Sequence, residues 1–122
     1  MYSPQVLDHF QNPRNPGTVE DADAVIQIEN PACGDVLQLS AKMAAGRITE
    51  IGFLAKGCVP AMACASVLTE LVRERTVEEA RNVRREDLIE KLGRLPEAST
   101  HATHLAVDAL AALLKKLTQS DR

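Results

Sequence analysis

The chain has 122 residues, which fits one domain spanning residues 1–122. Hydrophobic residues make up 45% of the sequence, but only two Phe, one Tyr and no Trp are among them, so the predicted core is aliphatic. Fourteen Lys and Arg against 17 Asp and Glu leave a net charge of -3. Because the sequence has no basic cluster and few aromatic residues to stack on bases, nucleic acid is excluded as an expected partner.

The sequence predicts no membrane anchor and no secretion signal. No stretch approaches the roughly 18 apolar residues that a membrane span needs, and Asp8 stands where a signal peptide carries a basic or apolar residue. We therefore expect a cytoplasmic location and no membrane partner. Three cysteines are too few for a disulfide scaffold, and a reducing compartment keeps them as thiols for metal or sulfur chemistry.

The first half of the chain predicts one short helix followed by strands. Ser3 before Pro4 is typical of a helix start, and Asn12-Pro13 ends that helix. Residues 11–24 hold two prolines and a glycine with little periodicity, which favours an extended or turned linker. Apolar residues then alternate with polar ones in three successive segments, predicted as antiparallel strands at 25–29, 37–43 and 47–55.

The second half predicts helices. Pro60 is suited to begin a helix in which Leu68 and Leu71 recur at helical spacing. Thr76 and Glu79 form a capping-box pattern for the next helix, a further short helix ends before Gly93, and an apolar stripe predicts a last helix capped by Ser99 or Thr100. Strands followed by helices predict an α+β fold, with a small antiparallel three-stranded sheet and helices packed on one face.

Two cysteines lie in predicted loops beside glycines, Cys33 next to Gly34 and Cys58 after Gly57. Glycine lets the backbone approach a bulky ligand closely. Cys58 also precedes a predicted helix, whose N-terminal dipole favours thiolate, so it is the best nucleophile candidate. A buried packing role is the ordinary alternative for a single cysteine, but two glycine-flanked thiols together favour a ligand site.

The other candidates are less specific. Cys64 falls on the apolar stripe of its helix, where a core role is favoured. Asp35 is equally suited to be an oxygen ligand or to form a turn before a strand. His101 begins the last helix, where the dipole favours a neutral ring that can bind metal. His104, one turn before Asp108, is expected in a solvated ion pair, and a capping or surface role suffices for His9.

At these residues the sequence resembles the IscU/NifU N-terminal family of iron–sulfur cluster assembly scaffolds over nearly its whole length. The matching segments, in the family's order, are Leu7-Asp8-His9-Phe10-Gln11-Asn12-Pro13-Arg14-Asn15, Asn30-Pro31-Ala32-Cys33-Gly34-Asp35, Gly57-Cys58 with Ala61, Ala63 and Ser66, and His101 with Leu105-Ala106-Val107-Asp108-Ala109. The α+β order read from the periodicity is the order that this family implies.

The resemblance implies a site and a function. Cys33, Asp35, Cys58 and His101 match positions that bind zinc, iron or a labile [2Fe–2S] cluster. It also implies that a cysteine desulfurase delivers sulfur, that apo iron–sulfur clients receive the cluster, and that the protein is not an enzyme in the strict sense. A carboxylate among thiolates suits a site that must release its cluster.

The sequence departs from the family at two places. Ala102 stands where the family's third cysteine directly follows the histidine, and that cysteine is a cluster ligand and the usual persulfide acceptor. Cys64 is the spare thiol, so we hypothesise that it is a compensating ligand. The family's Leu-Pro-Pro-Val-Lys stretch is Leu95-Pro96-Glu97-Ala98-Ser99 here, so the resemblance does not extend to recognition by an Hsp70-type chaperone.

Two alternatives to a working scaffold stay open at this stage. The first is a zinc-bound sulfur acceptor, in which the metal orders the site and Cys58 takes sulfane sulfur from the desulfurase. The second is a degenerate paralogue that keeps the fold and acts as a metal-free binding module. A metal-free module would keep its melting temperature in chelator, because a bound metal stabilises the folded state by mass action.

Overall fold

The computed structural model describes residues 2–31 and 34–119. Along the chain the elements are α1 (Pro4–Gln11), β1 (Ala24–Asn30), β2 (Asp35–Ala44), β3 (Arg47–Lys56), α2 (Val59–Val72), α3 (Val77–Arg81), α4 (Arg85–Leu92), the 3-10 turn η1 (Glu97–Ser99) and α5 (His101–Gln119). The order is the predicted one, and each strand agrees with its predicted range to within two residues at either end.

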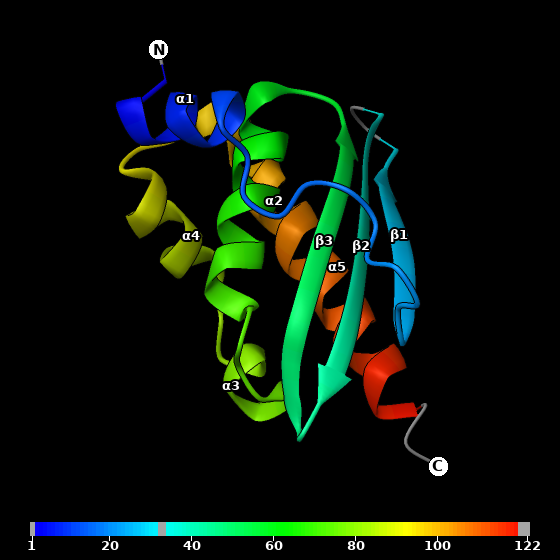
Figure 1. The fold of residues 1–122 in the computed structure, drawn as a ribbon. Helices are drawn as coiled ribbons and strands as arrows, with labels where there is room; N and C mark the ends of the chain where they lie inside the picture. The colour runs from blue at the N-terminus through cyan, green and yellow to red at the C-terminus, as the bar shows by residue number, and fades with distance from the viewer. Residues whose placement is uncertain (1, 32–33, 120–122) are drawn as a thin grey trace.

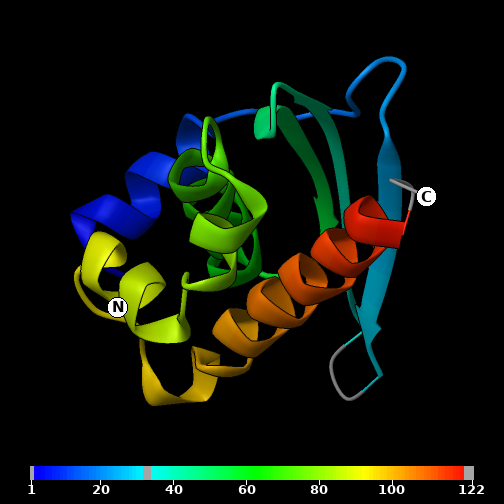
Figure 2. The ribbon, with the colours of Figure 1, turned by 90° about the horizontal axis from the view of Figure 1, so that it is seen from below.

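The three strands form one antiparallel sheet in the order β1-β2-β3. Leu39 in the middle of β2 lies opposite Ile26 on one side and Phe53 on the other. The helices pack on one face of this sheet, with α5 across β1 and β2 and α2 beside β3 (Figure 1 and Figure 2). The predicted α+β fold with helices on one face is therefore confirmed.

Helix α2 is the central helix of the molecule and is apolar nearly all round. It contacts α1, α4, α5 and β3. Ten of its 14 residues are buried, namely Pro60, Ala61, Ala63, Cys64, Ala65, Ser66, Val67, Leu68, Thr69 and Val72. A helix that is apolar on every side is stable only when other elements cover it. The position of its N-terminus is therefore fixed by the whole core.

The linker between α1 and β1 is irregular, with bends and a turn, in agreement with the predicted extended or turned linker, and it crosses the sheet at β3. The Phe53 N–H donates to the Asn15 carbonyl at 3.1 Å, and the Gly17 N–H donates back to the Phe53 carbonyl at 2.7 Å. A Cβ placed on Gly52 would lie 2.5 Å from the Gly17 carbonyl oxygen. The absent side chain of Gly52 therefore leaves the space through which the linker passes.

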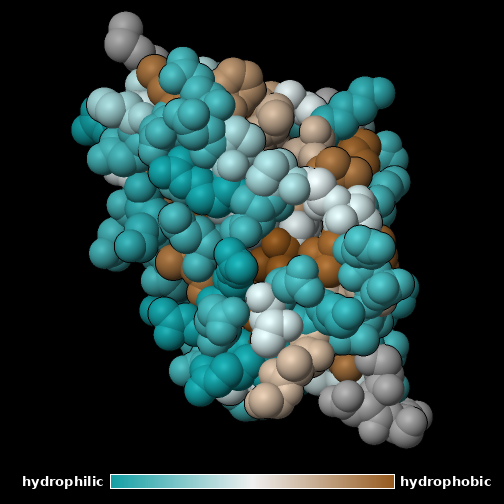
Figure 3. Space-filling model, viewed as in Figure 1, coloured by the Kyte–Doolittle hydropathy of each residue, from teal (hydrophilic) through white to brown (hydrophobic). Residues whose placement is uncertain are grey.

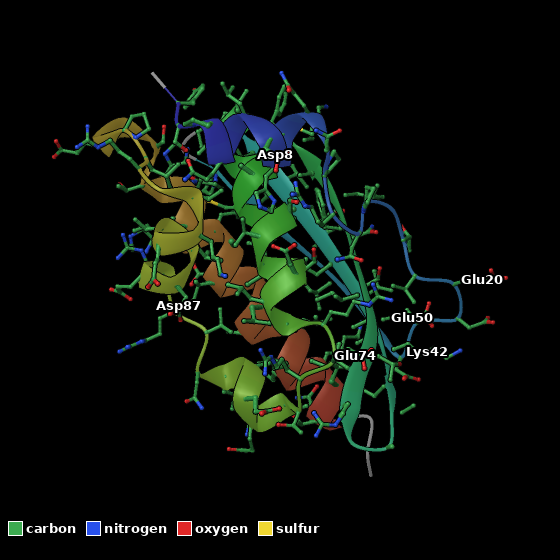
Figure 4. The ribbon with its side chains drawn as sticks, turned by 60° about the vertical axis from the view of Figure 1, so that its left-hand side comes forward. Asp8, Glu20, Lys42, Glu50, Glu74 and Asp87 are labelled. Atoms are coloured by element: carbon green, nitrogen blue, oxygen red, sulfur yellow. The ribbon has the colours of Figure 1, made fainter. Side chains whose placement is uncertain are left out.

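We expect Gly52→Ala to destabilise the protein by about 1–3 kcal/mol, because the added methyl group overpacks a backbone contact. Chemical denaturation measures the change in the free energy of unfolding. The matched control is Glu50→Ala on the same strand, where the side chain is exposed (Figure 4) and a change of no more than about 0.5 kcal/mol is expected. Equal stability of the two variants would contradict this account of the linker crossing.

A polar cluster holds α1 and the start of the linker against α2. His9 Nδ1 and Ser66 Oγ are 2.8 Å apart, and the Arg14 N–H donates to the same hydroxyl at 2.8 Å. Arg14 also pairs with Asp8, at 2.8 Å, and its Nε lies 3.8 Å from a carboxylate oxygen of Glu70. His9 is only 7% exposed, so the capping or surface role expected from the sequence is wrong.

Burial of His9 makes the stability depend on pH. Burial lowers the pKa of His9 below its ordinary value of 6.5, and the Arg14 charge lowers it further, against opposing effects of Glu70 and Asp8. The unfolded chain therefore binds a proton at a higher pH than the folded protein does. The contribution of His9 is complete above about pH 6.5 and is lost as the pH falls below that value.

We expect the melting temperature to decrease between pH 7 and pH 5, and to decrease less in His9→Gln, whose side chain does not titrate there. Differential scanning calorimetry of both proteins across this range measures the effect. An identical pH dependence in the variant would rule out His9 as its source.

The surface seen in Figure 3 is mostly hydrophilic, with hydrophobic residues in small separate areas. Among the described residues, the exposed large apolar side chains are Leu7, Phe10, Val25 and Leu54. Within residues 2–31 and 34–119, none of the helices combines the length and the hydrophobicity needed to cross a membrane.

Candidate metal centre

Three elements begin at the same end of the molecule, which is the upper end in Figure 1: β2, α2 and α5. Asp35 is the first residue of β2, Cys58 is the N-cap of α2, and His101 is the first residue of α5. Antiparallel pairing puts the start of β2 beside the end of β3, because Val36 lies opposite Lys56. The connection from β3 to α2 therefore carries Cys58 past Asp35.

The three side chains form one compact group. One ligand atom from each of Asp35, Cys58 and His101 lies within 4.8 Å of the other two. Cys58 Sγ donates a hydrogen bond to Asp35 Oδ2 at 3.3 Å, and His101 Nε2 lies 3.6 Å from the same oxygen. Asp35 is 4% exposed, whereas Cys58 and His101 are half-buried. The carboxylate is therefore the inner member, with the thiol and the imidazole toward solvent.

Cys58 does not have the lowered pKa that was expected from its place at a helix N-terminus. Burial raises the pKa of the Cys58 thiol above its usual range, and the Asp35 carboxylate that accepts its hydrogen bond raises it further. The Ala61 backbone N–H in the first turn of α2 acts in the opposite direction, as expected for a helix N-terminus, but burial outweighs it. A metal ion must therefore displace a proton from this thiol when it binds.

Two other cysteines were predicted for the site. Cys33 lies outside the residues that the structure describes. Cys64 is fully buried in α2, which agrees with the core role favoured for it, and burial raises the pKa of its thiol to about 12. His104 and Asp108 are exposed and line a shallow groove next to His101. No ion pair between them is found in the described part of the chain, so that expectation is wrong.

The donor set fits a transition metal. Thiolate and imidazole are the ligands that zinc and iron share in proteins, and a carboxylate completes such sites. A fourth ligand from Cys33 would give two sulfur donors, one nitrogen donor and one oxygen donor. Ala102 follows His101 directly, is 1% exposed and offers no donor atom. Within the described residues, the group therefore consists of the predicted Asp35, Cys58 and His101, and position 102 contributes no ligand.

Comparison with known proteins shows the family of this chain and agrees with its fold. Residues 1–121 match the family model of the NifU-like N-terminal domain, and the chain belongs to this family. The fold agrees with that of a crystal structure of a NifU-like N-terminal protein from Brucella abortus, with a TM-score of 0.80, 19% identity and coverage of 96% of this chain and 94% of the other.

Two relatives carry names that describe a function. The "Iron-sulfur cluster assembly scaffold protein IscU 1" of Archaeoglobus fulgidus is 46% identical over 110 residues, which are 90% of this chain and 72% of the relative. The "Iron-sulfur cluster assembly scaffold protein IscU" of Aquifex aeolicus is 40% identical over 116 residues, 93% of this chain and 74% of the relative. Resemblance to the IscU/NifU N-terminal family is thereby confirmed.

Proposed function

We propose that this protein is an iron–sulfur cluster assembly scaffold that binds iron or a labile [2Fe–2S] cluster as its cargo. The observation that carries the proposal is the group formed by Asp35, Cys58 and His101, which brings three kinds of metal-binding side chain within 4.8 Å in a member of the NifU-like family. We assign Cys33 as the fourth ligand. A cysteine desulfurase is the expected sulfur donor, and apo iron–sulfur proteins are the expected recipients.

The residues present suit temporary binding. Asp35 is a hard oxygen ligand, which binds iron of a thiolate site less tightly than a further cysteine would. The same carboxylate accepts the Cys58 hydrogen bond and lies beside His101, so contacts within the group hold these three side chains together. Asp35 is therefore both a weak metal ligand and a hydrogen-bond acceptor, which suits a protein that takes up and releases a cluster.

A second candidate function is supported by Ala102 and by the exposure of Cys58. Position 102 has no thiol, and Cys64 is fully buried. The half-buried Cys58 is therefore the accessible thiol in the described part of the chain. In this alternative, zinc orders the site and Cys58 accepts sulfane sulfur from the desulfurase, without cluster assembly. Zinc, as opposed to iron, is the resident metal in this case.

Anaerobic reconstitution with ferrous iron, sulfide and a cysteine desulfurase tests the proposal. Wild type, Cys33→Ser and Cys64→Ala are compared by visible absorption and by metal content. The scaffold function predicts cluster absorption in wild type and in Cys64→Ala, and its loss in Cys33→Ser. Loss in Cys64→Ala without unfolding would make Cys64 the compensating ligand.

Three outcomes for the wild type separate the functions. Cluster absorption supports the scaffold, and colourless protein with stoichiometric zinc supports the sulfur acceptor. Metal-free protein whose melting temperature does not change in chelator supports the binding module and contradicts both metal-dependent functions. A cytoplasmic location stays a prediction, and the resemblance gives no support for recognition by an Hsp70-type chaperone.

A further inference from the structure

Gly57 lies directly between the end of β3 and the N-cap residue of α2, and it has two unusual features. Its φ angle is +154°, a backbone conformation that residues with a side chain rarely adopt. A Cβ built on it would overlap Asp35 Oδ1 and would lie 2.6 Å from Asp35 Cγ and 3.1 Å from Asp35 Cβ. The Asp35 carboxyl group therefore fills the space that any side chain at position 57 would need.

This packing determines where the other carboxylate oxygen lies. With Oδ1 against Gly57, Oδ2 is the oxygen within 3.3 Å of Cys58 Sγ and 3.6 Å of His101 Nε2. A carboxyl group is rigid and planar, so displacing Oδ1 moves Oδ2 as well. A side chain at position 57 would therefore separate Asp35 from the two other members of the group.

We infer that Gly57 is a positioning residue of the metal centre: its missing side chain leaves the space that holds the Asp35 carboxylate against Cys58 and His101. The part of this inference that concerns metal affinity rests on the proposed function. The packing of Gly57 against Asp35 does not, because it follows from the positions of these two residues alone.

The chain offers a control that separates the two features of Gly57. Gly46, in the turn between β2 and β3, has a φ angle of +78°, and a Cβ on it would meet nothing within 4 Å. Gly46→Ala therefore introduces backbone strain without a clash, far from the site. Gly57→Ala introduces both.

The test is a double-mutant cycle between positions 57 and 35, with Gly46→Ala beside it. Anaerobic Co²⁺ titration, followed by the absorption of cobalt bound to thiolate, gives the affinity. Disturbing the groups that hold a metal ligand in place typically weakens binding about 10–100-fold, and we expect this loss for Gly57→Ala because its methyl group displaces Asp35. Gly46→Ala should bind nearly as the wild type does. In an Asp35→Ala background, Gly57→Ala should have little further effect.

Wild-type affinity in Gly57→Ala would overturn the inference, and so would an equal loss with and without the Asp35 side chain. If the wild type itself binds no Co²⁺, the proposed function fails, and thermal unfolding of the metal-free proteins decides the inference. A destabilisation by Gly57→Ala that shrinks when Asp35 is replaced supports it. The same destabilisation in both backgrounds contradicts it.

Discussion

Replacing Cys58 with serine is expected to weaken metal binding by at least about 100-fold. A serine hydroxyl does not ionise at neutral pH and is a poor ligand for zinc or iron, so the change removes one of the thiolate ligands. Losing only a contact that supports a ligand already lowers metal affinity about 10–100-fold, so losing the ligand itself should lower it further. The hydrogen bond from Cys58 Sγ to Asp35 Oδ2 shows that position 58 points into the group. Competition with a chromophoric chelator measures the affinity of purified wild type and variant.

The matched control for this experiment is Cys64→Ala. Cys64 belongs to the same helix, but it is fully buried and its thiol is not part of the ligand group. We expect its metal affinity to equal that of the wild type, with a modest loss of stability from the small cavity. Equal affinity of Cys58→Ser and the wild type would contradict the assignment of Cys58 as a ligand.

The largest expected loss of stability comes from Leu68→Ala. Leu68 is fully buried in α2, a helix that is covered by α1, α3, α4, α5 and β3. Truncating such a leucine costs about 2–5 kcal/mol, from the lost transfer free energy and the cavity that remains. The control is Leu54→Ala on β3, where the leucine is 49% exposed and a change within about 0.5 kcal/mol is expected.

Chemical denaturation of both variants gives the free energies of unfolding. The cavity left by Leu68→Ala would also disturb the position of Cys58, because Cys58 is the N-cap of the same helix. Similar stability of the two leucine variants would show that α2 is not the centre of the core.

The fold could be predicted because most of its helices and strands have clear local sequence patterns. Alternation in β2 places Leu37, Leu39 and Ala41 on the buried face, and all three are buried. The capping box of Thr76 and Glu79 is present, with hydrogen bonds in both directions. These features depend on residues close together in the chain, which is why periodicity and spacing reveal them.

Contacts between residues distant in sequence could not be predicted in the same way. In the cluster that holds α1 against α2, no local pattern indicates that His9 is buried against Ser66. For Cys58 the helix N-terminus was a correct prediction, but the effect of burial on its pKa depends on Asp35 and the packing around it. The resemblance supplied the ligand set, and the structure added that a single carboxylate oxygen lies near both Cys58 and His101.

We propose that Cys33, Asp35, Cys58 and His101 together hold the metal, although position 102 has no thiol. X-ray absorption spectroscopy of the protein loaded with one equivalent of zinc tests this most directly. The account predicts two sulfur ligands at about 2.3 Å and two nitrogen or oxygen ligands at about 2.0 Å. A shell of three sulfur atoms, or protein that retains no zinc, would contradict it.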